Sequence, residues 1–270
     1  MARMKTPIYL DHNATTPPAP EVVDAMTRAL TDLWGNPSSS HAPGRAARAA
    51  IDEARAEVAH LLGCDPDEIL FTGGGTESDN LAVVGLAEAR EPDGRHLVIS
   101  NVEHAAVEKP CAWLETRGWQ VTRVGVGPDG TVDAATFVDA LRPDTVLASL
   151  MLGNNETGAL QPVAEVARAC RERGVTVHSD AAQAVGKMPV RVADLGVDLL
   201  TIAGHTFSRP IRTGALYVRR GTPLVAYLRG AGHARGLLSG TEPTGVFVGL
   251  GVAFRLAAAG AERRARDVAA

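Results

Sequence analysis

The chain has 270 residues, of which 45% are hydrophobic and 21% are charged, and its formal net charge at pH 7 is -4. This length and composition suffice for a large buried core and exclude the fibrous and disordered classes. The small negative charge argues against nucleic acid or an anionic membrane as a general partner. No window approaches the ~18 apolar residues that a membrane-spanning helix needs.

The start of the chain and the cysteines favour a cytoplasmic protein. Prolines and an aspartate interrupt residues 1–18 before any apolar stretch long enough for a signal peptide. Cys64, Cys111 and Cys170 are widely spaced and include no CxxC pair, so neither a disulfide framework nor a metal site is predicted. We interpret all three as buried small residues.

Helical and extended segments alternate from residue 45 onward, which is typical of a parallel sheet covered by helices. Apolar residues recur at spacings of three and four over 45–62, which predicts a helix that ends at Gly63. The fold class predicted is α/β, with a mostly parallel central sheet flanked by helices. Further helices are predicted over 77–89, 105–116, 162–173 and 246–269, and strands over 69–72, 97–100, 121–126, 146–150, 175–179, 199–203 and 215–218.

The first predicted strand ends in a glycine-rich turn, Gly73-Gly74-Gly75, after which Thr76 opens a helix. Free backbone N–H groups, the positive end of a helix and the Thr76 hydroxyl together suit a phosphate. A tight turn capped by Thr76 explains the same residues without a ligand. The GK[ST] ending and the GxGxxG spacing are absent, which argues against a nucleotide-binding loop.

Three later strands are also followed by polar residues, at the sheet edge where open α/β folds bind ligands. His104 is either a structural histidine or a group that stacks on a flat ring or moves a proton. Asn155 belongs to an ordinary Asn/Gly turn or donates to a ligand oxygen. Asp180 caps a helix or pairs with a pyridinium nitrogen. Together, the four places predict a pocket for a phosphorylated aromatic cofactor.

Short motifs extend in order along nearly the whole chain. They are YLDHNATT at 9–16, GNPSSSH at 35–41, GTESDN at 75–80, Glu103-His104, NNETG at 154–158, DAAQAVGK at 180–187, Gly204-His205 and SGT at 239–241. This set resembles the cysteine desulfurases, within the class V aminotransferase group of fold-type I enzymes that depend on pyridoxal 5'-phosphate (PLP). The resemblance implies a homodimer with sites at the subunit interface, and sulfur transfer from L-cysteine that leaves alanine and an enzyme persulfide.

The resemblance also implies which residues hold the cofactor phosphate. Gly75, Thr76 and His205 match the family's phosphate-binding positions. Thr241 matches a residue that reaches the phosphate of the neighbouring subunit.

Four further matches surround the ring of the cofactor. His104 is expected to stack on the ring and is the predicted catalytic residue. Asp180 is expected to pair with the ring nitrogen, and Asn155 and Gln183 to contact the ring oxygen. Implied partners are a second copy of the chain and a sulfur-acceptor or iron-sulfur assembly protein.

The chain departs from the family where the cofactor lysine belongs. The family pattern is Ser-x-His-Lys followed by Gly-Pro-Lys-Gly. In this chain residues 203–212 read AGHTFSRPIR, so Thr206 stands at the position of the lysine that forms the Schiff base with the cofactor. A threonine has no amine to tether the cofactor and no suitable pKa for proton transfer. None of the three lysines, Lys5, Lys109 and Lys187, is a convincing replacement.

Other departures concern the phosphate site and the C-terminal part. Ala203 lacks a phosphate-binding hydroxyl, and Leu238 stands where an arginine is usual. The family's persulfide-forming cysteine and a substrate-binding arginine would follow residue 270.

These observations lead to competing hypotheses. The first is a cysteine desulfurase-like protein with weak or absent activity. The second is a non-catalytic binding or regulatory homologue that partners an active desulfurase or a sulfur acceptor. A third is an enzyme that binds PLP noncovalently and uses His104 or His205 as base. We expect a strand-like segment over 1–15 that packs near the site, a PLP-binding large domain over 16–245, and a helix over 246–270 that leads toward an absent small domain.

Overall fold

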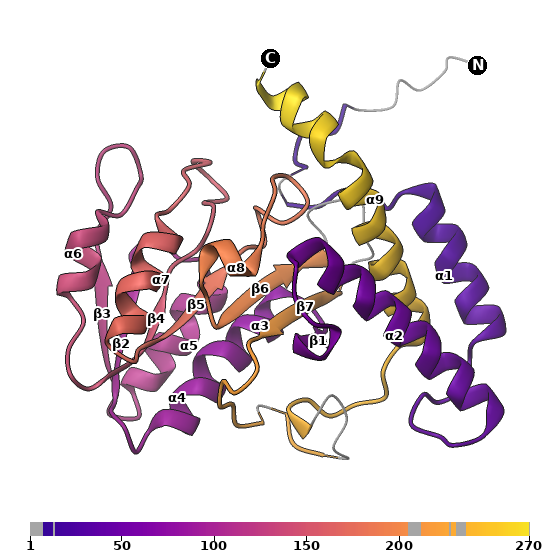
Figure 1. Ribbon diagram of the computed structural model, residues 1–270, viewed down its shortest axis with the longest axis horizontal. Coiled ribbons are helices and arrows are strands. Elements are labelled where there is room, and N and C mark those ends of the chain that lie inside the picture. Colours follow the sequence, from indigo (N-terminus) through magenta and orange to yellow (C-terminus); the bar gives the residue numbers. More distant parts are fainter. Residues whose placement is uncertain (1–7, 13, 205–211, 227, 231–235, 270) are drawn as a thin grey trace.

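The computed structural model describes residues 8–12, 14–204, 212–226, 228–230 and 236–269, without the side chains beyond residue 260. A seven-stranded sheet of order β1-β7-β6-β5-β4-β2-β3 forms its centre (Figure 1). The strands are β1 (Ile69–Thr72), β2 (His96–Ser100), β3 (Gln120–Val124), β4 (Thr145–Ser149), β5 (Thr176–Asp180), β6 (Leu199–Ala203) and β7 (Gly214–Val218).

Strand β7 is antiparallel to both of its neighbours, β1 and β6, while the other pairs are parallel. Because two reversals restore the direction, β1 runs the same way as the parallel strands. The carboxyl ends of β1, β2, β4 and β5 therefore meet at one edge of the sheet, and the predicted mostly parallel α/β fold is confirmed.

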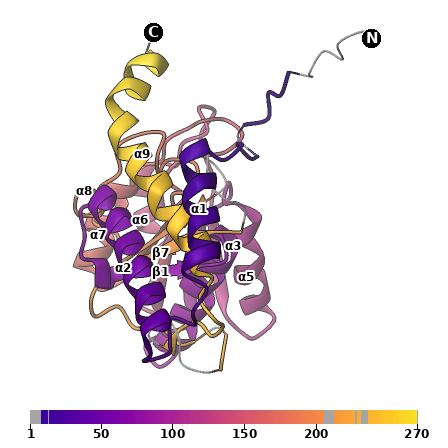
Figure 2. The same cartoon turned by 90° about the vertical axis from the view of Figure 1, so that its right-hand side faces the viewer.

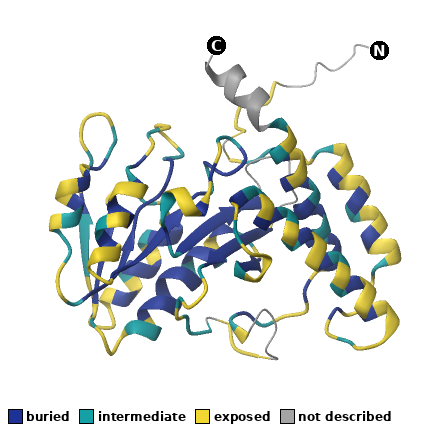
Figure 3. Cartoon of the chain, in the orientation of Figure 1, coloured by how far each residue is buried: buried dark blue, intermediate teal, exposed yellow. Residues whose placement is uncertain are grey.

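Helices cover both faces of the sheet, whose strands are almost wholly buried (Figure 3). One face packs against α2, α6, α7 and α9, and the other against α3, α4 and α5. Each face therefore has its own hydrophobic core. Consecutive residues of β1 belong to different cores, because Phe71 packs on the α2 side of the sheet and Leu70 packs on the α5 side. The helices are α1 (Pro20–Asp32), α2 (Ala42–Leu62), α3 (Gly75–Asn80), α4 (Leu86–Arg90), α5 (Ala105–Glu115), α6 (Ala134–Asp139), α7 (Val163–Glu172), α8 (Val192–Leu195) and α9 (Thr244–Ala269).

Helix α2 begins before the predicted residue 45 and ends as predicted. The His41 ring accepts a hydrogen bond from the Gly44 N–H at 3.3 Å, which caps the first turn. Gly63 adopts φ 70°, a left-handed conformation that ends the helix at little steric cost.

Helix α1 packs on the outside of α9 (Figure 2). A Cβ added to Gly249 of α9 would lie 2.5 Å from the Met26 side chain of α1, so the close packing of the two helices depends on a glycine. The sequence analysis predicted no helix over α1.

The helix predicted over 77–89 is present as one continuous helical run from α3 to α4. Its middle, Leu81–Gly85, is π-helical. This wider turn is fully buried in the hydrophobic core on the face of the sheet that α4 and α5 also cover.

The N-terminal segment lies beside the sheet edge without regular structure. Residues 8–12, 14 and 15 form no strand, although Asp11 and Ala14 line the same cavity as the strand ends. Among the described residues, no helix is both long and apolar enough to cross a membrane.

Candidate functional site

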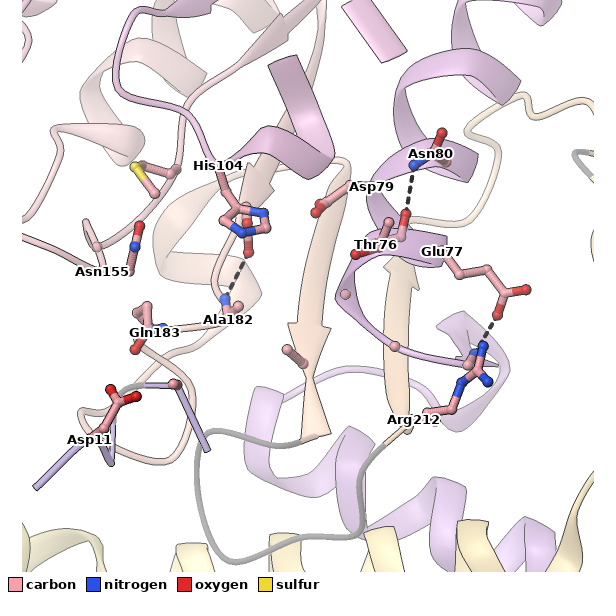
Figure 4. Close-up of a pocket in the computed structure, with 18 residues that line it drawn as sticks. Asp11, Thr76, Glu77, Asp79, Asn80, His104, Asn155, Ala182, Gln183 and Arg212 are labelled. Atoms are coloured by element: carbon pink, nitrogen blue, oxygen red, sulfur yellow. Dashed lines mark hydrogen bonds between the residues drawn. The ribbon is translucent and has the colours of Figure 1, made fainter. Parts of the chain in front are cut away.

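A cavity of about 840 Å³ opens at the carboxyl edge of the sheet (Figure 4). Its walls come from the segments that follow β1, β2, β4 and β5, as the sequence pattern predicts. The predicted site residues that the structure brings together around it are Gly75, Thr76, His104, Asn155, Asp180 and Gln183.

The glycine turn after β1 is held in place by close backbone packing. A Cβ added to Gly214 of β7 would lie 2.8 Å from the carbonyl carbon of Gly74, so β7 needs a glycine there to approach the turn. The Glu77 carboxylate accepts a hydrogen bond from the Gly73 N–H. Thr76 is exposed at the cavity wall, where its hydroxyl is available to a ligand. The turn is therefore preorganised before any ligand binds.

Two buried carboxyl groups, Asp79 and Asp180, line the same cavity. The Ala182 N–H donates to Asp180 Oδ1 at 2.9 Å. Asp79 Oδ1 is buried and has no hydrogen-bond partner in the described part of the chain. Burial raises the pKa of Asp180, and burial together with the charge of Asp180 holds the pKa of Asp79 well above its usual range.

Among the described residues, His178 is the one candidate ion-pair partner of these two acids, and it carries no charge. His178 Nε2 lies 3.5 Å from Asp79 Oδ1, but burial lowers the pKa of His178 to about 3, so its ring is neutral at pH 7. One carboxylate oxygen of Asp79, one of Asp180 and one ring nitrogen of His104 all lie within 4.8 Å of one another. This corner of the cavity therefore favours a positively charged ligand group.

His104 is exposed and caps helix α5. Its Nδ1 accepts a hydrogen bond from the Ala106 N–H at 3.1 Å, which leaves Nε2 as the position that carries a proton. The ring lies between Asp79 and Asn155 in the view of Figure 4.

Asn155 and Gln183 line the side of the cavity away from the glycine turn (Figure 4). The neighbouring Asn154 shapes the loop, because its Oδ1 accepts hydrogen bonds from the N–H groups of Glu156 and Thr157 at 2.9 Å. Lys187 Nζ donates to Gln183 Oε1 at 2.5 Å.

Neither Lys109 nor Lys187 lines the cavity, and each lies on a separate hollow of the surface. Lys5 lies outside the described residues, as do His205 and Thr206. Thr241 is described; it is exposed and does not line the cavity. Its predicted role toward a neighbouring subunit stays a prediction.

The cysteines are unsuited to nucleophilic chemistry. Cys111 and Cys170 are buried, as expected, while Cys64 is only partly buried. Burial raises the pKa of Cys64 and of Cys170 to about 12, and that of Cys111 above its usual range. Because the thiolate is the reactive form, all three stay unreactive at neutral pH.

The sequence analysis gave no role to Asp11, Asp79 or Arg212, which also line the cavity. Asp79 belongs to the GTESDN motif. It follows Gly75 by four residues on helix α3, and this spacing places both residues on the side of the helix that faces the cavity. Arg212 follows β6 and precedes β7, at a place where the family pattern has a glycine.

Glu103 is a further buried acid that ties β2 to β4. Its Oε1 accepts hydrogen bonds from the Ser100 hydroxyl at 2.6 Å and the Met151 N–H at 2.9 Å, while Oε2 is buried without a partner in the described structure. Burial raises the pKa of Glu103 to about 8.

We expect E103Q to stabilise the protein by up to about 5 kcal/mol at pH 8.5, because each unit between the unfolded and the folded pKa is worth about 1.4 kcal/mol. Between the unfolded pKa near ~4.3 and the folded pKa, the native state holds a proton that the unfolded state has lost, so wild-type stability falls as pH rises through this window. Urea unfolding at pH 5 and pH 8.5 measures the difference, which should be small at pH 5. An equal effect at both pH values would contradict an ionisation origin.

Comparison with known proteins places these features in a family. Residues 8–267 match the family model described as aminotransferase class-V. The chain is 44% identical over 254 residues to the cysteine desulfurase IscS of Dictyoglomus turgidum and 48% identical over 257 residues to that of Methylococcus capsulatus. These matches cover 94% of this chain and 64% of each relative's length.

Solved structures agree with the sequence relatives. A structure of SspA in complex with cysteine superposes with a TM-score of 0.89 at 39% identity, covering 92% of this chain and 72% of that one. A NifS-like protein superposes with a TM-score of 0.91 at 35% identity, covering 93% of this chain and 70% of that one. The relatives are PLP-dependent. The chain therefore belongs to the aminotransferase class-V family, and the sequence relatives named above are cysteine desulfurases.

Proposed function

We propose that this chain is a cysteine desulfurase-like protein whose cavity binds PLP noncovalently and whose transfer of sulfur from L-cysteine is impaired. The observation that carries the proposal is that two buried acids, Asp79 and Asp180, line the same cavity as the glycine turn. A protonated ring nitrogen at one end of a ligand and a phosphate at the other suit this distribution of charge and N–H donors.

The described residues fit the recognition of PLP. Asp79 Oδ1 is buried without a hydrogen-bond partner in the described part of the chain, and a ring nitrogen bound at Asp180 would bring a positive charge close to both acids. His104 would cover one face of the ring, and Asn155 and Gln183 would donate to its oxygen. The N–H groups of the glycine turn and the Thr76 hydroxyl would hold the phosphate.

The same residues do not supply the covalent chemistry of the family. Thr206 has no amine, and the described lysines do not line the cavity. Bound PLP supplies an electron sink, but no lysine of the described residues lines the cavity to remove and return the substrate proton, a loss of roughly 10²- to 10⁴-fold in rate. The described cysteines are unreactive thiols outside the cavity.

Absorbance spectroscopy of the purified protein tests the proposal. We expect added PLP to bind saturably and to be lost on dialysis, and borohydride treatment before dialysis to leave no pyridoxyl group on the protein. With PLP and L-cysteine, we expect sulfide and alanine far below ordinary desulfurase rates. Ordinary turnover, or PLP that resists dialysis, would contradict the proposal.

A second candidate is a non-catalytic homologue that partners an active desulfurase or a sulfur acceptor. The preserved cavity beside a missing lysine favours it, because binding and catalysis are separable. Co-purification that recovers only self-association, with no other partner, would count against it. A homodimer, an iron-sulfur assembly partner and a cytoplasmic location remain proposals from the family resemblance and the sequence.

A further inference from the structure

Arg212 has an unusual backbone conformation. Its φ is 60°, and it is the one non-glycine residue of the described chain with a positive φ. A Cβ makes this left-handed conformation unfavourable, so it persists only where the surroundings impose it. Such residues cluster at ligand sites.

The position of Arg212 is fixed by its neighbours. The next residue, Thr213, is fully buried, and its carbonyl accepts a hydrogen bond from the Gly204 N–H at 2.6 Å. Gly214 then packs against the glycine turn. These contacts place the Arg212 Cα at the rim of the cavity, and Figure 4 shows its side chain beside Glu77 and the turn.

Arg212 also stands out by its charge. It is the sole lysine or arginine among the described residues that line the cavity, which also include four acids. Its guanidinium makes no ion pair or hydrogen bond with any described residue, and the neighbouring Glu77 carboxylate is already engaged by the Gly73 N–H. An exposed guanidinium that pairs with no described residue presents a planar set of N–H donors that matches a phosphate.

We propose that Arg212 is an anion-binding residue that recognises the phosphate monoester of the ligand in this cavity. It provides a positive charge, which neither an alanine at 203 nor a threonine at 206 carries. The inference rests on the proposed function for the identity of the ligand, but the anion site itself follows from the conformation, charge and placement of Arg212.

Two variants and two matched ligands test the proposal. We expect R212G to weaken PLP binding by roughly 10- to 100-fold, measured by calorimetry, and to leave the binding of pyridoxal, which lacks the phosphate, unchanged. We expect R212K to fall between wild type and R212G. The melting temperature of unliganded R212G should rise by about 2–4 °C, because glycine relieves the left-handed strain.

Opposite changes in ligand affinity and melting temperature would separate ligand recognition from a structural role. Equal PLP affinity in wild type and R212G, or an equal loss for PLP and pyridoxal, would overturn the inference and leave noncovalent PLP binding standing.

Inorganic pyrophosphate distinguishes this inference from the proposed function. If wild type binds no PLP but binds pyrophosphate in a manner that R212G abolishes, the anion site stands and the proposed function fails. If wild type binds neither compound, both are overturned.

Discussion

Replacing Thr206 by lysine is expected to change PLP from a dialysable ligand into a covalently held one. The rest of the cavity already presents Asp180, His104 and the glycine turn at one sheet edge, so an amine is the missing element for attachment. After borohydride reduction and proteolysis, mass analysis of T206K should find a pyridoxyl group at position 206. Wild type should carry none.

T206M is the matched control, because methionine has nearly the length of lysine without its amine. It should bind PLP as reversibly as wild type does. A pyridoxyl group found on Lys5, Lys109 or Lys187 of wild type would refute the account of the cofactor site given above. A T206K protein that binds PLP but never retains it would show that position 206 does not face the cofactor.

Replacing Asp180 by asparagine is expected to move cofactor affinity and protein stability in opposite directions. PLP binding should weaken by roughly 10- to 150-fold, because a charge-assisted hydrogen bond is worth about 1.5–3 kcal/mol. The unliganded protein should gain about 1–3 kcal/mol at pH 8, since a buried carboxylate beside Asp79 is removed. The asparagine oxygen can still accept from the Ala182 N–H.

The pH dependence of the D180N effect has a definite sign. Because the folded pKa of Asp180 lies above its unfolded value, the wild-type free energy of unfolding falls as pH rises above ~4, and the advantage of D180N grows in the same direction. Urea unfolding and PLP titration measure the two effects. D52N, at a half-exposed position on helix α2, should change neither. Destabilisation together with weaker binding would indicate that Asp180 serves only the fold.

Much of the architecture follows from local patterns in the sequence. The helix that ends at Gly63 and the doubly buried strands are predictable, because helical spacing, a left-handed glycine and continuous apolar runs each act over a few residues. Helix α1 carries local helix signals, with Pro20 at its first position and Glu21 in its first turn, and the sequence pattern was overlooked there. What the sequence does not show is its close packing on α9 at Gly249, more than two hundred residues later in the chain.

The candidate site divides in the same way. Polar residues after β1, β2, β4 and β5 are visible in the sequence, and their convergence follows from the rule that parallel strands share a carboxyl edge. The place of β7 is decided by the tertiary structure. This antiparallel strand lies between β1 and β6, and β1 still runs in the same direction as the parallel strands.

The sequence by itself determined the family, the sheet-edge motifs and the absence of a lysine at position 206, because residue identity and spacing carry these directly. Only the tertiary structure decided that Asp79 joins Asp180 in a buried acid pair, that His178 is neutral beside them, and that Arg212 lies at the cavity rim without an ion pair to any described residue. Burial, pKa and charge balance depend on which distant segments pack together, and no local pattern records that.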